Sequence, residues 1–180
     1  MTVEQTDIEG ILVIKPNVFG DARGHFFESF REDVMKQHGV NEEFVQDNQS
    51  LSNKGILRGL HFQKNPYAQG KLVRVIKGAV RDVVVDIRKG SATYGKHFSI
   101  DLNEENKTMM YVPPGFAHGF LTLEDQTIFA YKCTNYYYPE SEGAVLWNSP
   151  SLGIEWDIEN PLLSAKDKIA TDFAEFVSPF

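Results

Sequence analysis

The chain carries a histidine in the short stretch RGLHFQ, residues 58–63, between an arginine and a glutamine. His61 can be a core or edge residue with satisfied hydrogen bonds, or it can be a base with a guanidinium nearby that holds an anion. An imidazole exchanges protons near neutral pH, and the planar Arg58 guanidinium matches phosphate oxygens bidentately. The stretch therefore raises the hypothesis of acid–base chemistry on an anionic ligand.

A second histidine follows a tight turn in PPGFAHGF, residues 113–120. The spacing P-x-G-x-x-H resembles the second motif of cupins, which are small jelly-roll barrels that often bind a metal; the alternative is a tight turn with a capping histidine. Metal-binding cupins carry H-x-H and a glutamate in their first motif, but Gln63 stands here in place of the second histidine. His61 and His118 are fewer than the three protein ligands a catalytic ion normally takes, and glutamine is a poor transition-metal ligand. We therefore expect no metal.

Composition narrows the class of protein. The chain has 180 residues, 42% of them hydrophobic and 24% charged, which is typical of one globular domain. A net charge of −7 argues against a nucleic-acid partner but leaves room for an anionic small molecule in a cationic cleft. The N-terminus lacks the features of a signal peptide, and no apolar run approaches the roughly 20 residues of a membrane span. With one cysteine, Cys133, we expect a soluble cytoplasmic protein without membrane or nucleic-acid partners.

Short strands separated by turn residues dominate the pattern, which favours an all-β antiparallel barrel over an α/β sheet. Helices are expected only at the edges. One is predicted over 29–39, where Ser29-x-x-Glu32 forms a capping box, and one over 164–176, opened by Ser164-x-x-Asp167. The strands are predicted over 11–16, 25–30, 57–63, 71–78, 79–88, 96–102, 109–113, 118–123, 127–137 and 143–148.

An ordered set of segments gives a more specific indication. From about Phe19 to Asp167, the set resembles the dTDP-4-dehydrorhamnose 3,5-epimerase family. The resemblance implies a single jelly-roll domain over residues 1–180, a homodimer, no cofactor, and inversion of C3 and C5 of a dTDP-linked 4-keto-6-deoxy sugar in dTDP-L-rhamnose synthesis. The segments are DARGHFFES (21–29), FVQDNQS (44–50), RGLHFQ, QGKLVRVIKGAVRDVVVDIR (69–88), PPGFAHGF, YKCTNYYYPESEG (131–143) and LSAKD (163–167).

Inversion beside a ketone needs a base, a group that stabilises the enolate oxygen, and an acid on the other face. The resemblance names His61 as the base, paired with Asp167, although a capping role alone would also explain Asp167. It places Lys71 beside the sugar carbonyl, whereas the simpler interpretation is an exposed cation. A hairpin between the strands of Lys71 and Asp82 would let Asp82 orient the lysine.

Tyr131 is the acid that the resemblance implies. Strand alternation supports an inward hydroxyl, because Phe129, Tyr131, Cys133 and Asn135 fall on one face. A buried tyrosine can also simply satisfy its hydroxyl with a hydrogen bond.

Other residues are expected to bind the substrate. Arg23 and Arg58 suit the diphosphate, although strict alternation puts Arg58 and His61 on opposite faces unless a bulge or bend occurs at Gly59. The N-terminal segment, about residues 1–50, is expected to contribute to the dimer interface, so that Phe19, Arg23 and Glu28 complete the partner's site. The remaining substrate-binding candidates are Gln46, Asn48, His118, Phe27, Tyr136, Glu142 and Lys166.

Three alternatives stay open at this point. A relative that inverts only C3 or only C5 can keep the same four acid–base groups, and a 3,4-ketoisomerase is expected to lack part of the set. A non-catalytic cupin that binds a sugar nucleotide would not need the complete set. A metal-dependent cupin is disfavoured by Gln63 and the missing glutamate.

Overall fold

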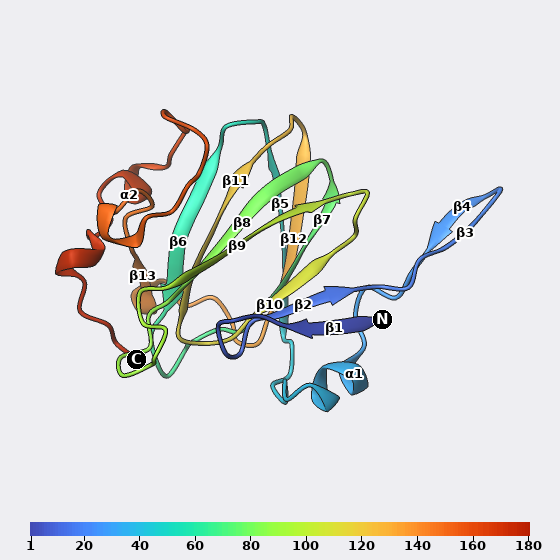
Figure 1. The fold of residues 1–180 in the computed structure, drawn as a ribbon, viewed down its shortest axis with the longest axis horizontal. Helices are drawn as coiled ribbons and strands as arrows, with labels where there is room; N and C mark the ends of the chain where they lie inside the picture. Colours follow the sequence, from blue (N-terminus) through green and yellow to red (C-terminus); the bar gives the residue numbers. More distant parts are fainter.

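The computed structural model describes all 180 residues and contains two antiparallel sheets that face each other (Figure 1). The first sheet has the order β1 (Thr2–Gln5), β2 (Leu12–Lys15), β10 (Met109–Val112), β7 (Lys71–Lys77), β12 (Thr127–Cys133) and β5 (Gln46–Ser52). The second has the order β13 (Glu142–Ala144), β6 (Leu57–Gln63), β11 (Phe116–Thr122), β8 (Ala79–Asp86) and β9 (His97–Asn103). The predicted all-β jelly roll of the cupin type is confirmed.

The remaining elements are short and peripheral. Strands β3 (Phe19–Asp21) and β4 (Gly24–Phe26) form a separate hairpin that projects away from the barrel (Figure 1). The helices are α1 (Glu32–Gln37) and α2 (Ala165–Lys168), and single 3₁₀ turns occupy Pro139–Ser141, Pro150–Leu152 and Phe173–Glu175. No helix is both long enough and apolar enough to cross a membrane.

Strand β8 shows how the core is divided. Its sequence AVRDVVVD is buried along almost its whole length, so both of its faces need apolar cover. Val80 and Val84 pack between the two sheets, in the cluster that contains Phe129. Val83 and Val85 face the other way and pack against a cluster that includes residues of the C-terminal segment, such as Trp156. The C-terminal segment therefore acts as an outer layer on the five-stranded sheet and brings α2 close to β6 (Figure 1).

Both predicted helices are shorter than expected. The capping box at Ser29 is wrong, because α1 begins after Arg31 and no side chain caps it. The capping role of Ser164 is confirmed, since its hydroxyl accepts from the Asp167 backbone N–H, but α2 ends at Lys168 rather than near residue 176. Each helix buries a single residue, Met35 in α1 and Asp167 in α2, so tertiary packing supports only a short helix in each segment.

Several strand predictions also change, and two of the changes bear on the overall topology. The segment 44–50 was not expected to be a strand, yet β5 occupies Gln46–Ser52; its alternating side chains are polar on both faces, so no apolar pattern marks it. The predicted hairpin between residues 71–78 and 79–88 is wrong, because the turn at Gly78 carries the chain from one sheet to the other. Lys71 and Asp82 consequently belong to opposite sheets.

The expected irregularity at Gly59 is confirmed. The register of β6 against β11 runs from His61 opposite His118 to Arg58 opposite Phe120, which requires a bulge. Gly59 has φ +140°, and a Cβ atom there would lie 2.4 Å from the Gly119 Cα atom. Only glycine fits this close backbone approach, and the bulge turns Arg58 and His61 toward the same cavity.

We expect Gly59→Ala to lower the free energy of unfolding by about 3 kcal/mol or more, because the strained φ and the backbone overlap add together. Gly39→Ala is the matched control, since Gly39 has φ +88° but a Cβ atom there would meet no other atom within 4 Å. The control should cost only about 1 kcal/mol. Urea denaturation of both variants checks this, and equal costs would mean that close approach to Gly119 does not require the glycine.

Candidate active site

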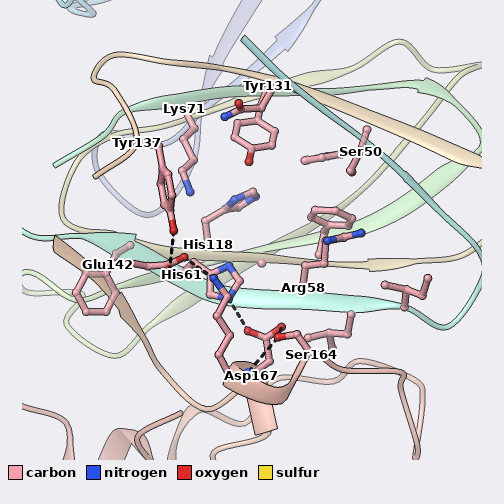
Figure 2. A pocket seen from close by; sticks show the side chains of 18 of the residues that line it. Ser50, Arg58, His61, Lys71, His118, Tyr131, Tyr137, Glu142, Ser164 and Asp167 are labelled. Carbon is pink, nitrogen blue, oxygen red and sulfur yellow. Dashed lines mark hydrogen bonds and ion pairs between the residues drawn. The ribbon is translucent and has the colours of Figure 1, made fainter. Parts of the chain in front are cut away.

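One large cavity, of about 810 Å³, opens between the two sheets. It contains all four residues predicted to act as acid, base or electrophile, and they come from both sheets and from α2 (Figure 2). His61 lies on β6, Lys71 on β7 and Tyr131 on β12, while Asp167 projects from α2 behind His61. The predicted substrate-binding residues that also line this cavity are Arg58, Gln46, Asn48, His118, Glu142 and Lys166.

His61 and Asp167 form a tight pair. His61 Nε2 lies 2.5 Å from Asp167 Oδ1, and Ser164 Oγ donates to Asp167 Oδ2 at 2.7 Å. Burial would by itself raise the pKa of Asp167, which is 1% exposed, but the hydrogen bonds from His61 and Ser164 outweigh burial and lower that pKa. The helix cap and the contact with histidine are compatible, because the Asp167 backbone N–H serves the cap and its carboxylate serves His61.

A second histidine–carboxylate pair lies beside the first. His118 is opposite His61 in the register of β11 and β6, and its Nε2 lies 2.8 Å from Asp82 Oδ1. Asp82 is fully buried, and its Oδ2 atom has no hydrogen-bond partner. The sequence predicts that Asp82 orients Lys71 directly across a hairpin, but the Asp82 carboxylate instead accepts a hydrogen bond from His118.

Lys71 is half-buried and its ammonium points into the cavity, so the interpretation as an exposed surface cation is wrong (Figure 2). Burial lowers the pKa of Lys71, and the negative charges of Asp82 and Glu142, with that of Cys133 whenever its thiol is ionised, partly offset the effect of burial. Burial also raises the pKa of the Cys133 thiol, which keeps this group neutral near pH 7. The two carboxylates are therefore the anions that favour a protonated Lys71.

Tyr131 projects into the cavity from the six-stranded sheet, with Lys71 Nζ 5.8 Å from the centre of its ring. The predicted alternation is confirmed within β12, since Phe129 and Cys133 on the same face as Tyr131 are buried, but Asn135 lies beyond the end of the strand. Burial raises the pKa of Tyr131, so its hydroxyl keeps its proton at neutral pH. A protonated phenol inside a cavity can act as a proton donor.

The two sides of the cavity carry different polar groups. Figure 2 shows Tyr137 and Glu142 on one side and Arg58 with Ser50 on the other, and the acid–base groups lie between them. Glu142 accepts from Lys166 Nζ at 2.6 Å and from the Tyr137 hydroxyl at 3.3 Å. Arg58 donates to the hydroxyl of Ser52 at 3.2 Å, which holds its guanidinium over the cavity.

Several predicted residues lie outside this cavity. Phe19, Arg23, Phe27 and Glu28 belong to the projecting N-terminal region, and the Arg23 side chain is 90% exposed with Asp21 as its ion-pair partner. The side chain of Tyr136 is 65% exposed and does not line the cavity of its own chain.

Sequence reasoning missed Tyr137, which lines the cavity where Tyr136 was expected. The predicted strand 127–137 ends in fact at Cys133, and alternation beyond that point has no meaning. Other lining residues, among them Ser50, Gln49 and Gln69, carried no recognisable signal as isolated polar residues, and Ser164 was noted only as a helix cap. Gln63 was noted only as a missing metal ligand.

The donor set does not suit a metal ion. No group of three or more histidine, cysteine or acidic side chains is arranged to hold one. The Gln63 side chain, which stands where metal-binding cupins have a histidine, hydrogen-bonds to backbone atoms of Tyr67, Tyr136 and Tyr138. The residues present at this position thus build loop structure rather than a coordination sphere.

A jelly-roll barrel with this set of groups in its cavity defines a cupin-type enzyme that moves protons by acid–base chemistry. The chain matches the family model of dTDP-4-dehydrorhamnose 3,5-epimerase over residues 5–175. It therefore belongs to the dTDP-4-dehydrorhamnose 3,5-epimerase family, and it is an isomerase.

Individual relatives agree with the family assignment. The dTDP-4-dehydrorhamnose 3,5-epimerase of Shigella flexneri is 52% identical over 93% of each chain. The crystal structure of the dTDP-6-deoxy-D-glucose-3,5-epimerase of Legionella pneumophila, in complex with dTDP-4-keto-L-rhamnose, aligns with a TM-score of 0.94 and 45% identity over 98% of this chain and 94% of that one. A 3'-monoepimerase from Streptomyces bikiniensis, in complex with dTDP-quinovose, aligns with a TM-score of 0.89 and 35% identity over 94% and 86% of the two chains.

Proposed function

We propose that this protein inverts C3 and C5 of dTDP-4-dehydro-6-deoxy-D-glucose to give dTDP-4-dehydro-L-rhamnose, in dTDP-L-rhamnose biosynthesis. The observation that carries the proposal is the single cavity that holds the His61–Asp167 pair, Lys71 and Tyr131. Family membership and relatives that act on dTDP-linked 4-keto sugars support the choice of substrate. No cofactor is part of the proposal, because removal of a proton next to a ketone needs only acid–base groups.

His61 is the proposed base. Its Nε2–H is donated to Asp167, which leaves the Nδ1 lone pair free to take the proton from C3 or C5. The electron pair of the broken C–H bond moves to the ketone oxygen and forms an enolate. The positive charge on Lys71 stabilises this oxygen.

Tyr131 is the proposed acid. His61 lies on the five-stranded sheet and Tyr131 on the six-stranded sheet, so a sugar held between them meets the base on one face and the acid on the other (Figure 2). Proton return from the Tyr131 hydroxyl then inverts the carbon that His61 deprotonated. Tyr131 regains a proton and His61 releases one to solvent before the next cycle.

Binding of the nucleotide is assigned to the two sides of the cavity and to a second chain. Arg58 is the proposed diphosphate ligand, and Tyr137, Glu142 and Lys166 are proposed to contact the rest of the substrate, with Gln46, Asn48 and His118 lining the same space.

The functional unit is proposed to be a homodimer of single-domain chains. The projecting hairpin β3–β4 supports this, because Phe19 is 64% exposed and would be covered by a partner. Phe19 and Arg23 of this hairpin would complete the site of the other protomer. Phe27 and Glu28, which follow β4, and Tyr136 are proposed to contribute to the same site.

The single cysteine supports a cytoplasmic location for the protein. Cys133 is a free buried thiol, which suits a reducing compartment such as the cytoplasm. Neither nucleic acid nor membrane is part of the proposed function, whose partners are the sugar nucleotide and a second copy of the chain.

Proton NMR of dTDP-4-keto-6-deoxy-D-glucose in D₂O tests the proposal. With chelator-treated enzyme we expect deuterium to enter at both C3 and C5 during formation of the L-sugar. Deuterium at one carbon alone would instead show a single-site epimerase that uses the same groups. If neither position exchanged while dTDP still bound, the protein would be a binding module or an enzyme for another sugar, and the proposal would be wrong.

A further inference from the structure

The segment that carries Tyr137 has an unusual pattern of hydrogen bonds. It follows the end of β12 at Cys133 and has no regular structure before the 3₁₀ turn at Pro139–Ser141. The three successive backbone N–H groups of residues 136–138 all donate to amide oxygens of side chains. The acceptors are Asn135 Oδ1 at 2.9 Å, Gln46 Oε1 at 2.9 Å and Gln63 Oε1 at 2.8 Å, in that order.

Gln63 makes the largest contribution to this pattern. Its Oε1 accepts from the Tyr138 N–H, while its Nε2 donates to the carbonyls of Tyr136 at 3.1 Å and Tyr67 at 2.6 Å. The Gln63 side chain thus holds the backbone on both sides of Tyr137 and joins it to a second loop. Gln63 is only 5% exposed, so water cannot easily replace these bonds.

The packing of neighbouring groups agrees with a fixed position for Tyr137. The rings of Tyr67 and Tyr138 stack with centroids 3.9 Å apart, which ties together the two loops that Gln63 connects. The hydroxyl of Tyr137 reaches Glu142, and its side chain lines the cavity (Figure 2). Within a strand, backbone hydrogen bonds to the neighbouring strands would fix the position of a residue like Tyr137. Here β12 has already ended, so side-chain amides accept and donate the backbone hydrogen bonds instead.

We propose that Gln63 is a positioning residue of the active site, whose amide holds Tyr137 in the wall of the cavity against Glu142. Gln63 acts through Tyr137, and its hydrogen-bonding groups are used by the protein backbone. The position that carries a metal ligand in other cupins has, in this chain, become a clamp between two loops. The effect on substrate affinity rests on the proposed function, whereas the clamp itself can be measured without any reaction.

The direct test is hydrogen exchange of backbone amides in the free protein. In Gln63→Met, which keeps the length of the side chain and loses its amide, we expect the Tyr138 N–H to exchange at least about tenfold faster, because it loses its acceptor. Gln63→Glu keeps an acceptor for the Tyr138 N–H but loses the two N–H donors of the amide. The exchange rate of the Tyr138 N–H in this variant should therefore lie between the rates in the unsubstituted protein and in Gln63→Met. Unchanged protection at Tyr138 in Gln63→Met would overturn the proposal, whatever the enzyme does.

Kinetics then test the action through Tyr137. We expect Gln63→Met to raise KM for the sugar nucleotide about tenfold and to change kcat less than about threefold, since the acid–base groups stay in place. In a Tyr137→Ala background the same substitution should have almost no further effect on KM. Leu102→Ala, which removes a buried side chain from the core, is the control for loss of stability alone and should leave KM unchanged. Independent, multiplying effects of Gln63→Met and Tyr137→Ala would overturn the proposal.

Discussion

Replacement of His61 by alanine is expected to lower kcat by about 10³-fold or more and to leave dTDP affinity nearly unchanged. The loss should be this large because the imidazole is the only group of the Asp167 pair that can take a proton from carbon, and general bases of this kind typically contribute 10²- to 10⁴-fold. The nucleotide would keep its affinity, since its proposed ligands, Arg58 among them, are untouched. Deuterium exchange at C3 and C5 and calorimetric titration with dTDP measure the two quantities.

A matched control and a companion variant sharpen this test. His97→Ala removes a histidine from β9 of the same sheet, outside the cavity, and should keep full activity. Asp167→Asn leaves the shape of the pair but removes its negative charge, so we expect a smaller loss than for His61→Ala. Substantial exchange activity in His61→Ala would show that another group is the base.

Replacement of Lys71 by methionine is expected to lower kcat by about 10²- to 10³-fold. The substitution keeps most of the apolar stem and removes the charge that would stabilise the enolate oxygen, and loss of one preorganised donor at such an oxygen typically has this effect. Single-turnover rates, measured beside dTDP affinity, separate this loss from a loss of binding. If kcat fell less than about threefold, the enolate would have to be stabilised elsewhere, for example by His118.

The protonation of Lys71 also gives a prediction about pH. Since burial lowers its pKa, the ammonium loses its proton at a lower pH than a free lysine does, and activity should fall as pH rises through this value. Asp82→Asn keeps an acceptor for His118 but removes a negative charge that favours the ammonium, so the alkaline limb of the kcat profile should move to lower pH. The other groups whose charge acts on Lys71 are Glu142 and Lys166, and Cys133 when its thiol is ionised; none of them is substituted in this variant.

A direct titration makes the pH prediction independent of turnover. Carbon-13 NMR of the lysine Cε atoms, with the Lys71 signal assigned from Lys71→Arg, follows the ammonium itself. We expect its midpoint to move to lower pH in Asp82→Asn. A uniform loss of activity at every pH, with an unmoved midpoint, would mean that Asp82 serves only to hold His118.

The sequence by itself determined which residues could carry the chemistry. Through their resemblance to the epimerase family, the ordered segments from residue 21 to 167 brought His61, Lys71, Tyr131 and Asp167 forward together, and all four line one cavity. The inward direction of Tyr131 was also correct, because a period of two is a local property of any strand that has one buried face. The bulge at Gly59 could also be anticipated. Strict alternation would place Arg58 and His61 on opposite faces of the strand, so their assignment to one site required an irregularity between them.

Only the tertiary structure decided which strands are neighbours and where each one ends. Lys71 and Asp82 belong to two different sheets rather than to one hairpin, because a short turn can join strands of one sheet or pass between sheets. Tyr137 replaced Tyr136 in the cavity because β12 ends at Cys133, after which side-chain amides set the direction of the chain. Alternation within a strand depends on its own residues, whereas pairing and strand ends depend on groups far away in the sequence, such as Gln46 and Gln63. The physical reason is that a backbone N–H donates to whichever acceptor the whole fold brings to it, and no local pattern records that choice.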